Sequence, residues 1–463
     1  MPHSTESWAQ NDIDFHLHSY TDARAHQEKG PLIIERGDGV YVIDNQGNRY
    51  LEGMAGLWST ALGFSEQRLV AAAHRQLQTL PFYHTFSHKS HPSSISLAEK
   101  LIALAPVPMS KVYFTNSGSE ANDVLVKLIW YRNNAIGQPR RKKFISRLGG
   151  YHGVTGLSAS LTGLATVHNG FDLPLPGFLH VSTPHFYRYA LPGETEEQFA
   201  SRLAEELEDL INREGPETIA AFVAEPLMGA GGVIVPPNTY WEKIQKVCRR
   251  HEVLIVADEV ICGFGRTGKL FGCETFAIVP DAMVLSKQLS SSYQPIAAVM
   301  INDDLYQGIA DQSRALGVLG TGFTGSGHPV ATAVALENVR IIEEDKLVEH
   351  AAQMGARLHA GLESLALHPL VGEVRGCGLI AGVELVADKG NKSPWDFVGK
   401  LGKYFMARAQ ANGLIVRGIG DTIALCPPLI INAVEIDVLL ERFVRSLDET
   451  HFYRALQVSI PNN

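Results

Sequence analysis

The stretch VLIVADEVICGFGRTG (residues 253–268) decides the fold, because it joins a buried-strand pattern to a glycine-rich turn. Its first five residues are all apolar, as in a strand of a parallel sheet that is covered on both faces. Two acids follow the strand, Asp258 and Glu259. Three glycines then appear in the G-x-G-x-x-G spacing of dinucleotide-binding turns: Gly263, Gly265 and Gly268. Either the glycines or the acids could serve a ligand at this strand end.

The residues after the glycines argue against a dinucleotide site. In such a site the last glycine opens a helix, and an acid ends the next strand. Here the stretch after Gly268, KLFGCETFAIVPDAMV, has no helical periodicity, and Asp281 precedes the next strand instead of ending it. The glycines therefore predict a loop that bends tightly past something bound at the strand end.

The composition is that of a globular protein without a nucleic-acid footprint. Hydrophobic residues make up 45% and charged residues 19% of the 463 residues, far from the disordered class. The 49 acidic residues exceed the 40 basic ones and give a net charge of −9, which argues against nucleic-acid binding. The length allows about three domain-sized units, although large α/β enzymes often keep one dominant sheet.

Cysteine usage and the distribution of apolar runs predict a soluble, cytoplasmic protein. The five cysteines form no C-x-x-C pair, which argues against disulfides or a structural zinc site and favours a reducing compartment; we expect no metal. The first twenty residues are polar and acidic, without the apolar core of a signal peptide. No run of about 18 apolar residues suits a membrane helix, so no membrane partner is expected.

Short β-branched runs alternate with helical patterns, which predicts an α/β fold with a mostly parallel central sheet. Two stretches show clear helical periodicity, 119–135 and 196–215, and the second is followed by Pro216. Seven runs are typical of buried strands: residues 111–115, 142–147, 178–182, 219–226, 253–259, 282–287 and 296–301.

The pattern changes near Gly325 and predicts a smaller α+β domain. A long helical pattern at 328–365 precedes 371–386, which alternates like an antiparallel strand pair; a helix and a strand at 414–430 follow. The hairpin pattern GVYVIDNQGNRYLEG (39–53) has no place in a parallel sheet and is expected to join this domain. We therefore expect an N-terminal segment packing with the small domain, a large cofactor-binding domain and a C-terminal small domain: residues 1–60, 61–325 and 326–463.

Groups at three strand ends together suit one cofactor. Asp258 ends a buried strand, where open α/β sheets bind ligands, although an aspartate there can also simply cap the next turn. Lys287 ends another strand, and a lysine held in a cleft can have a lowered pKa and form a Schiff base. In FTNSGSEAN (114–122) a helix N-terminus suits a phosphate, or Ser117 and Glu120 form a capping box. An acid, a lysine and a phosphate cradle match pyridoxal phosphate.

Six motifs, in this order, extend the match over most of the chain, from about Tyr20 to Pro428: FTNSGSEAN, GGYHG, AEPLMGAGG, ADEVICGFGRTG, LSKQLSSSYQPI and GFTGSGHP. With them the sequence resembles a class III aminotransferase of the fold-type-I pyridoxal-phosphate superfamily. Within that family it is most similar to the ω-amine:pyruvate transaminases. The resemblance implies an α/β fold with a large domain around a mostly parallel sheet and a smaller α+β domain.

The resemblance also implies the cofactor contacts. Lys287 would form the Schiff base with pyridoxal 5'-phosphate and carry the proton during transfer, and Asp258 would pair with the pyridine nitrogen. Tyr151 and Val260 would cover the two ring faces. Thr324 would reach the phosphate from the partner subunit, which implies a homodimer with shared active sites, or a tetramer of such dimers. The full cofactor set is Ser117, Gly118, Ser119, Tyr151, His152, Glu225, Asp258, Val260, Lys287 and Thr324.

The substrate residues follow from the same resemblance. Arg417 matches the mobile arginine that pairs with the carboxylate of the amino acceptor; without the resemblance it is a surface arginine at a strand end. The aromatic lining is Tyr20, Trp58, Phe86 and Tyr151. Without the resemblance, each of these aromatic residues is typical of an ordinary core position.

One position departs from related transaminases. The ornithine and γ-aminobutyrate transaminases carry an arginine shortly before the paired prolines, where TIALCPPL places Ala424. A fixed carboxylate clamp is therefore not expected, and bidentate recognition by arginine is hard to replace with an apolar residue. This favours pyruvate over 2-oxoglutarate as the amino acceptor.

The predicted activity is transfer of an amino group from a primary amine or ω-amino acid to pyruvate, giving an aldehyde or ketone and alanine. The alternatives of the same fold are an aminomutase, a racemase and a decarboxylating transaminase. An alternative of a different class is a non-catalytic module that senses pyridoxal phosphate. The partners expected are small molecules and a second copy of the chain.

Overall fold

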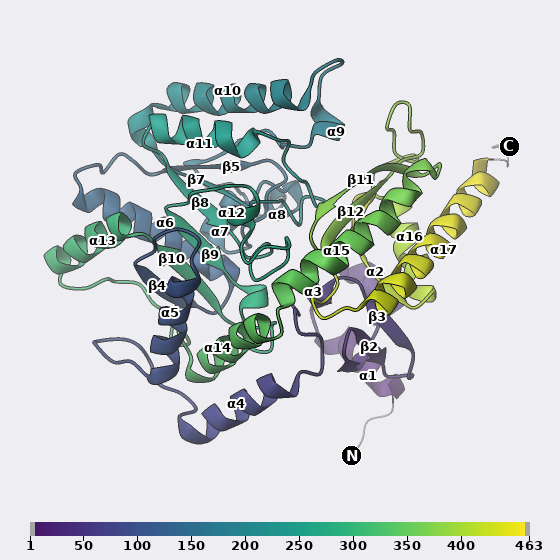
Figure 1. Ribbon diagram of the computed structural model, residues 1–463, viewed down its shortest axis with the longest axis horizontal. Coiled ribbons are helices and arrows are strands. Elements are labelled where there is room, and N and C mark those ends of the chain that lie inside the picture. The colour runs from purple at the N-terminus through teal and green to yellow at the C-terminus, as the bar shows by residue number, and fades with distance from the viewer. Residues whose placement is uncertain (1–4, 459–463) are drawn as a thin grey trace.

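The computed structural model describes the backbone of residues 5–458 and the side chains of residues 8–454. The outermost residues of the two expected terminal domains, 1–4 and 459–463, lie outside this description. Figure 1 shows two lobes, a larger blue and teal lobe and a smaller one in which purple N-terminal strands lie beside green and yellow C-terminal elements.

A seven-stranded sheet forms the centre of the larger lobe, in the order β4-β10-β9-β8-β7-β5-β6. Neighbouring strands from β9 to β6 pair in parallel, and β10 pairs antiparallel with both β9 and β4. The mostly parallel α/β sheet expected from the sequence is confirmed. Its strands are β4 (Lys111–Thr115), β5 (Lys143–Arg147), β6 (Phe178–Val181), β7 (Ile219–Ala224), β8 (Leu254–Asp258), β9 (Ala282–Leu285) and β10 (Ala297–Ile301).

Helices cover both faces of this sheet, which explains why the central strands are apolar throughout. In β8, Ile255 and Ala257 pack in the same core cluster as α10 and α11, whereas Val256 packs with α6 on the other face. Side chains of a strand alternate between the two faces, so two covered faces require a continuous apolar run. The covering helices are α6 (Gly118–Ala135), α7 (Gly156–Leu161), α10 (Glu196–Glu214), α11 (Tyr240–Arg250) and α13 (Asp303–Leu316).

The long helical pattern at 328–365 forms two helices, α14 (Pro329–Glu344) and α15 (Leu347–Glu363). The break lies at Lys346, whose φ of 52° is left-handed and cannot continue an α-helix. The remaining helices between residues 67 and 289 are α4 (Gln67–Thr79), α5 (Pro92–Leu104), α8 (Ala165–His168), α9 (Phe186–Tyr189), η1 (Pro216–Thr218), α12 (Gly272–Thr275) and η2 (Lys287–Leu289).

A four-stranded antiparallel sheet, β11-β12-β15-β14, forms the core of the smaller lobe. The expectation of one strand at 414–430 is wrong: a turn at Gly420 and Asp421 folds the segment back, so that Ile419 pairs with Thr422. The elements are β11 (Val371–Cys377), β12 (Ile380–Leu385), β13 (Leu414–Ile415), β14 (Arg417–Ile419), β15 (Thr422–Leu425), η3 (Ser364–Leu367), α16 (Lys400–Ala411) and α17 (Ala433–Val458).

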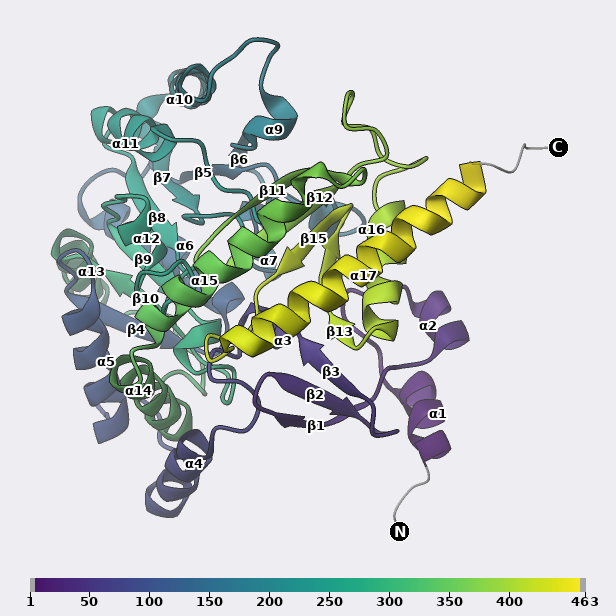
Figure 2. The same ribbon diagram turned by 45° about the vertical axis from the view of Figure 1, so that its right-hand side comes forward.

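The N-terminal hairpin pairs with the C-terminal part of the chain. Leu51 in β3 is in parallel register with Leu414 in β13, and Figure 2 shows these strands side by side. This pairing supports our proposal that residues 1–60 belong with the small domain. The elements here are α1 (Thr5–Phe15), α2 (Ala23–Lys29), β1 (Ile34–Asp38), β2 (Tyr41–Asp44), β3 (Arg49–Glu52) and α3 (Ala55–Trp58).

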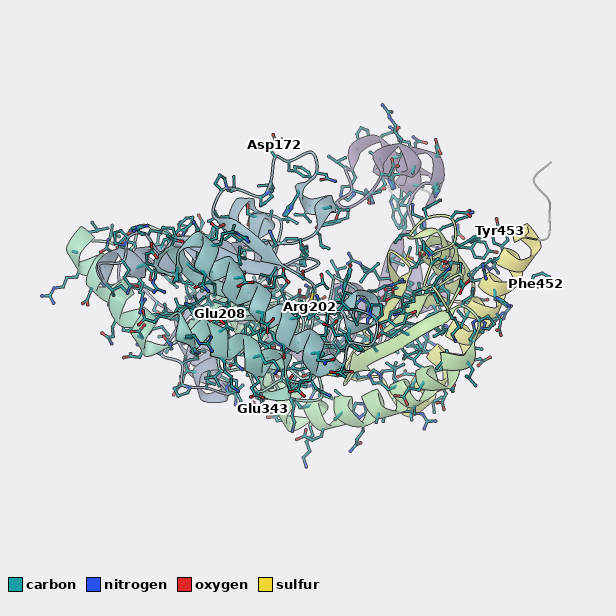
Figure 3. The ribbon with its side chains drawn as sticks, turned by 90° about the horizontal axis from the view of Figure 1, so that it is seen from above. Asp172, Arg202, Glu208, Glu343, Phe452 and Tyr453 are labelled. Atoms are coloured by element: carbon teal, nitrogen blue, oxygen red, sulfur yellow. The ribbon has the colours of Figure 1, made fainter. Side chains whose placement is uncertain are left out.

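The last helix is held against α16 by aromatic stacking. The rings of Tyr453 and Tyr404 are parallel, with centroids 4.1 Å apart, and Tyr453 appears near the end of α17 in Figure 3. Within the described residues, no helix is both long enough and apolar enough to cross a membrane.

Candidate active site

Asp258 and Lys287 lie at the same edge of the central sheet. Asp258 is the last residue of β8 and is in register with Val284 of β9, and Lys287 follows β9 after one residue. Because β8 and β9 are parallel, their carboxyl ends meet at one edge, where open α/β sheets bind ligands. The structure thus brings together the two residues on which the predicted chemistry depends.

The carboxylate of Asp258 is buried and held by several neighbours. Its Oδ2 atom accepts a hydrogen bond from Nδ2 of Asn122 at 2.9 Å and lies 2.8 Å from Nδ1 of His152. Its Oδ1 atom accepts from the backbone N–H of Val260 at 3.1 Å. These contacts fix the direction of the carboxylate, which leaves the two oxygens with different surroundings. His152, expected among the cofactor residues, lies against this acid.

Asn122 was not anticipated from the sequence. It lies one turn after Gly118 on α6, and its Nδ2 atom also donates to the carbonyl of His152 at 2.8 Å. It is fully buried in a helix face where most of the other buried residues are apolar. A buried amide needs hydrogen-bond partners, so an asparagine at the helical spacing from the expected phosphate cradle was the available signal.

Lys287 is held where its amine is readily deprotonated. Burial lowers the pKa of its ammonium, and the nearby carboxylates of Asp258 and Glu225 only oppose this effect. Within residues 8–454, no hydrogen bond or ion pair engages its Nζ atom. An amine whose neutral form is favoured by burial, and which has no hydrogen-bond partner among these residues, is suited to act as a nucleophile and a base.

Buried polar side chains hold the turn that carries Lys287 in place. Gln288 donates from Nε2 to the carbonyl of Gly263 at 2.6 Å, and its Oε1 atom accepts from Arg266 at 2.9 Å. Asn338 donates to the carbonyl of Gln288 at 2.8 Å. Lys287 itself has a left-handed φ of 45°, a conformation that the surrounding contacts must hold. None of these three anchoring side chains was identified from the sequence.

The glycine-rich loop serves this lysine turn and not a dinucleotide. No helix begins at Gly268, and the next helix, α12, has only four residues. Arg266, within the loop, donates to the carbonyls of Leu379 at 2.9 Å and Pro427 at 2.6 Å in the smaller lobe. Gly265 has a φ of +104°, which only glycine adopts without strain. The loop therefore connects the lysine turn to the smaller lobe.

The N-terminus of α6 faces the same edge. Ser117 is the N-cap, and its hydroxyl accepts from the backbone N–H of Glu120 at 3.2 Å, as in the capping alternative. Ser119 accepts with Oγ from the backbone N–H of Val154 at 3.1 Å. The serine hydroxyls are thus partly engaged, while a helix N-terminus suits an anion.

Gly118 forms a close approach that a larger residue would fill. A β-carbon on Gly118 would lie 3.2 Å from Cγ2 of Val260 and 3.7 Å from Cβ of Ser286. The missing side chain leaves room between the helix N-terminus, the strand end of Asp258 and the turn of Lys287. This cradle, together with the acid and the unpartnered amine, fits pyridoxal phosphate.

Glu225 and Tyr151 are joined by a hydrogen bond next to the end of β7, the strand beside β8. Glu225 accepts from the backbone N–H of Tyr151 at 3.0 Å and from that of Gly229 at 2.8 Å, and burial raises the pKa of its carboxyl group. Burial also raises the pKa of the Tyr151 hydroxyl; Tyr20 adds to this effect and Arg417 opposes it. Tyr20, Tyr151 and Arg417 are therefore neighbours.

Trp58 packs at the base of this region. It is 1% exposed and shares a core cluster with Ala424 and Cys426, and Cys426 lies close enough to Lys287 to affect its pKa. Ala424 is in cross-strand register with Arg417 in the β14–β15 hairpin. The position that departs from related transaminases is thus opposite the expected acceptor arginine.

Phe86 lies beside the loop that carries Thr324. A β-carbon on Gly322 would lie 2.8 Å from the ring of Phe86, and Phe86 is 44% exposed while Thr324 is exposed. A β-carbon on Gly325 would lie 2.8 Å from Oδ1 of Asn116, so this loop also lies beside the residue that precedes Ser117. Within the described side chains, no hydrogen bond joins Phe86 or Thr324 to Asp258 or Lys287.

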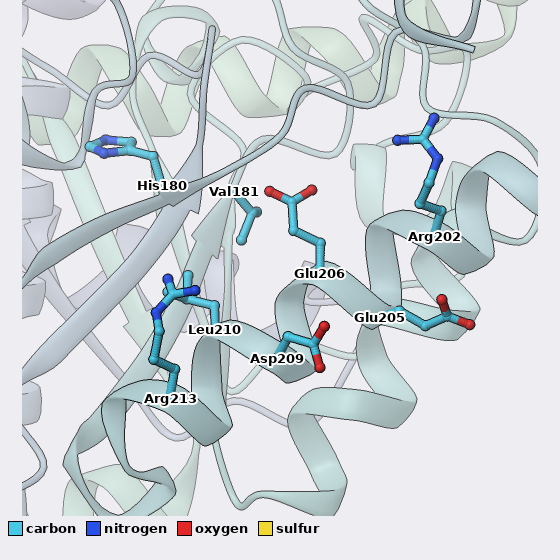
Figure 4. A pocket seen from close by; sticks show the side chains of 8 residues that line it. All are labelled: His180, Val181, Arg202, Glu205, Glu206, Asp209, Leu210 and Arg213. Atoms are coloured by element: carbon cyan, nitrogen blue, oxygen red, sulfur yellow. The ribbon is translucent and has the colours of Figure 1, made fainter. Parts of the chain in front are cut away.

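A separate groove of about 360 Å³ lies beside α10, and Figure 4 shows its charged lining. Arg202 is paired with Glu194 at 2.8 Å, and Glu206 accepts from Ser182 at 3.0 Å. None of the predicted site residues line it. We interpret the groove as part of the solvent-exposed surface of α10.

Comparison with known proteins agrees with this geometry. The family model for class III aminotransferases matches residues 23–447. The γ-aminobutyrate transaminase 1, mitochondrial, of Solanum lycopersicum is 49% identical over 450 residues, covering 96% of this chain and 84% of its own. The vanillin aminotransferase of Capsicum annuum is 47% identical over 421 residues, covering 91% and 92%.

Solved structures show the same fold. The ω-transaminase from Pseudomonas jessenii in complex with PMP superposes with a TM-score of 0.96 at 68% identity, covering 96% of this chain and 98% of that one. A thermostable ω-transaminase variant carrying W58M, F86L and R417L, engineered for asymmetric synthesis of enantiopure bulky amines, gives a TM-score of 0.96 at 67% identity, covering 96% and 99%. The chain therefore belongs to the class III aminotransferases, pyridoxal-phosphate-dependent enzymes of fold type I that transfer amino groups.

Proposed function

We propose that this aminotransferase moves an amino group from a primary amine or ω-amino acid to pyruvate, giving an aldehyde or ketone and alanine. The observation that carries the choice of acceptor is Ala424. It is fully buried and directly opposite Arg417, at the position where related transaminases place a fixed arginine. With one cation and no second clamp there, a keto acid with a single carboxylate fits better than 2-oxoglutarate.

Lys287 and Asp258 are proposed as the catalytic residues. When bound, pyridoxal phosphate supplies an aldehyde carbon and a pyridine ring that accepts electron density. The Nζ atom of Lys287 takes the proton that leaves the donor's carbon, because burial favours its neutral form. The carboxylate of Asp258 would accept a hydrogen bond from the pyridine nitrogen and favour its protonated form, and Asn122 and His152 hold that carboxylate.

The remaining residues of the site are proposed to bind and orient the cofactor. Ser117, Gly118 and Ser119 at the N-terminus of α6 would hold the phosphate, and Tyr151 and Val260 would cover the ring faces. Glu225 would orient the segment of Tyr151 through its backbone N–H. These residues occupy buried or half-buried positions, which limits the access of water to the site.

The substrate walls are proposed to be Tyr20, Trp58, Phe86 and Tyr151, with Arg417 for the acceptor carboxylate. The engineered ω-transaminase described above carries substitutions at a tryptophan, a phenylalanine and an arginine whose types and numbers coincide with Trp58, Phe86 and Arg417. That coincidence supports the assignment. The plant relatives named for γ-aminobutyrate make this ω-amino acid a candidate donor.

We also propose a homodimer with shared active sites. Phe86 and the loop of Thr324 lie side by side and expose both residues, which suits a contribution to the site of a partner subunit. We also propose a cytoplasmic location, because all five cysteines are free, as is usual in a reducing compartment. Some relatives are named as mitochondrial or chloroplastic enzymes.

A half-reaction experiment tests the proposed function. The purified holoenzyme should lose its yellow colour when β-alanine, γ-aminobutyrate or 1-phenylethylamine is added without a keto acid, and pyruvate should restore it. 2-Oxoglutarate should restore it far more slowly. Restoration by 2-oxoglutarate at the same rate would exclude the pyruvate assignment, and turnover with no keto acid would indicate an aminomutase.

A further inference from the structure

We propose that Asp12, His16, His18 and His26 form a binding site for a zinc-type transition-metal ion in the N-terminal segment. The cysteine pattern held no metal motif, and this cluster contains no cysteine. It lies outside the catalytic residues, and the proposal does not depend on which amine or keto acid the enzyme uses.

Three imidazoles converge on one carboxylate. Nε2 of His18 lies 2.9 Å from Oδ2 of Asp12, Nε2 of His26 lies 3.0 Å from the same oxygen, and Nδ1 of His16 lies 3.1 Å from Oδ1. One ligand atom each from Asp12, His16 and His18 lies within 4.8 Å of the others. The rings of His18 and His26 are 4.2 Å apart at their centroids.

Two helices bring these residues together. Asp12 is in the last turn of α1, and His16 lies four residues on, with its backbone N–H bonded to the carbonyl of Asp12 at 3.0 Å. Residues four apart share a helix face, as in helical metal-binding motifs. The chain then turns back, and α2 presents His26 to the same carboxylate.

The charge of the cluster favours a cation. Among the described side chains, Asp12 forms ion pairs only with histidines. The pKa of Asp12 is lowered to about 2, chiefly by the hydrogen bond with His18, so its carboxylate is ionised and ready to bind a metal. With neutral imidazoles the cluster carries one negative charge and no permanent cation.

A second cluster of possible metal ligands differs from the Asp12 cluster in its charge. His185, Glu373 and Glu384 also bring three ligand atoms together. However, Arg375 is paired with Glu373 and with Glu384, at 2.5 and 2.6 Å, and Arg188 pairs with Glu384 as well. Those carboxylates are already neutralised, so that cluster is a buried ion-pair network and not a metal site.

The ligand set selects the metal. Three imidazoles and one carboxylate suit zinc, cobalt, nickel or copper and not calcium or magnesium, which prefer oxygen ligands. Tetrahedral zinc with bonds of about 2.0–2.1 Å separates its ligand atoms by about 3.3 Å, close to the separations around Asp12. Asp12, His16 and His18 form the core of the site, because their ligand atoms all lie within 4.8 Å of one another, and His26 adds a contact to Asp12.

The site is open to ions and lies next to a substrate residue. A cavity of about 240 Å³ adjoins it, lined in part by Thr21, Gln27 and the three histidines. His18 is two residues before Tyr20, which neighbours Tyr151. A bound metal would tie α1 to α2 and fix the segment that carries this aromatic wall.

Metal titration of the untagged holoenzyme tests the proposal. After treatment with EDTA and dialysis, ZnCl2 is titrated by calorimetry, and CoCl2 is followed by its visible absorption, which reports tetrahedral nitrogen and oxygen ligation. We expect one ion per chain for the wild type and for His74→Ala, an exposed histidine on α4 that serves as the control. We expect His18→Ala to weaken binding by about 100-fold or more.

Asp12→Asn keeps the shape and a hydrogen-bond acceptor but removes the charge, so it should weaken binding to a similar degree if the site binds metal. Tryptic cleavage after Arg24 or Lys29, both exposed, gives a second measurement. At ten times the dissociation constant, zinc should slow it about tenfold in the wild type and not in His18→Ala. A wild type that binds no zinc, or equal binding by wild type, His18→Ala and Asp12→Asn, would overturn the proposal.

Discussion

Adding one methyl group at Gly118 should weaken cofactor binding without harming the fold. A β-carbon there would lie 3.2 Å from Cγ2 and 3.4 Å from Cγ1 of Val260, inside the optimal carbon separation of about 3.5–4.0 Å. Val260, which is expected to cover one face of the cofactor ring, must therefore move away from Gly118 by a few tenths of an ångström. Overpacking of this kind costs about 1–3 kcal/mol.

If this cost falls on the cofactor-bound state, Gly118→Ala should raise the dissociation constant of pyridoxal phosphate by about 5–150-fold. Gly156→Ala is the matched control: Gly156 is also the first residue of a helix, α7, and a β-carbon there meets nothing within 4 Å. Its dissociation constant should stay within about twofold of the wild type, and its thermal stability should stay equal or rise slightly.

The assay is an absorbance titration of the apoenzyme with pyridoxal phosphate, together with the melting temperature of each apoprotein. A dissociation constant for Gly118→Ala within twofold of the wild type would refute the cradle. A large fall in the melting temperature of the apoprotein with unchanged cofactor affinity would show that the close approach serves the fold instead.

Two further predictions concern the site residues Lys287 and Arg417, and a third concerns the buried acid Glu52. Lys287→Ala should slow the amine half-reaction by about 10²–10⁴-fold or more, measured by loss of cofactor absorbance; undiminished speed would exclude its role. Arg417→Leu should raise the KM for pyruvate by about 10–150-fold and leave the 1-phenylethylamine half-reaction within a few-fold; equal losses in both would contradict the acceptor role. Burial raises the pKa of Glu52 to about 7, and its carboxylate accepts the backbone N–H groups of Met54, at 3.2 Å, and Gly56. The folded state thus favours the neutral acid, so Glu52 lowers stability progressively from about pH 4.5 to 7, by about 3 kcal/mol above that range. The melting temperature of Glu52→Gln relative to wild type should therefore rise between pH 5 and 8, and a constant difference would contradict this reasoning.

The parallel strands could be predicted because a strand covered on both faces must be apolar throughout. Residues 253–257 and 282–285 are such runs, and each is followed by polar residues that need hydrogen-bond or ligand partners. The prediction of a single strand over residues 414–430 is wrong because the apolar run crosses a tight turn at Gly420. The short strands of a hairpin have no distinctive period that would reveal such a turn.

Most of the strand and helix pattern, the exclusion of a dinucleotide site, and the candidate pair of Lys287 and Asp258 could be read from the amino-acid sequence. These are local properties, since periodicity, turn residues and a charged group after an apolar run are readable along the chain. The groups that hold that pair, such as Asn122 on Asp258 and Arg266 on the lysine turn, became evident only in the folded chain. Their partners are up to 136 positions away, and no local pattern encodes a contact that exists only when the sheet and both lobes are assembled.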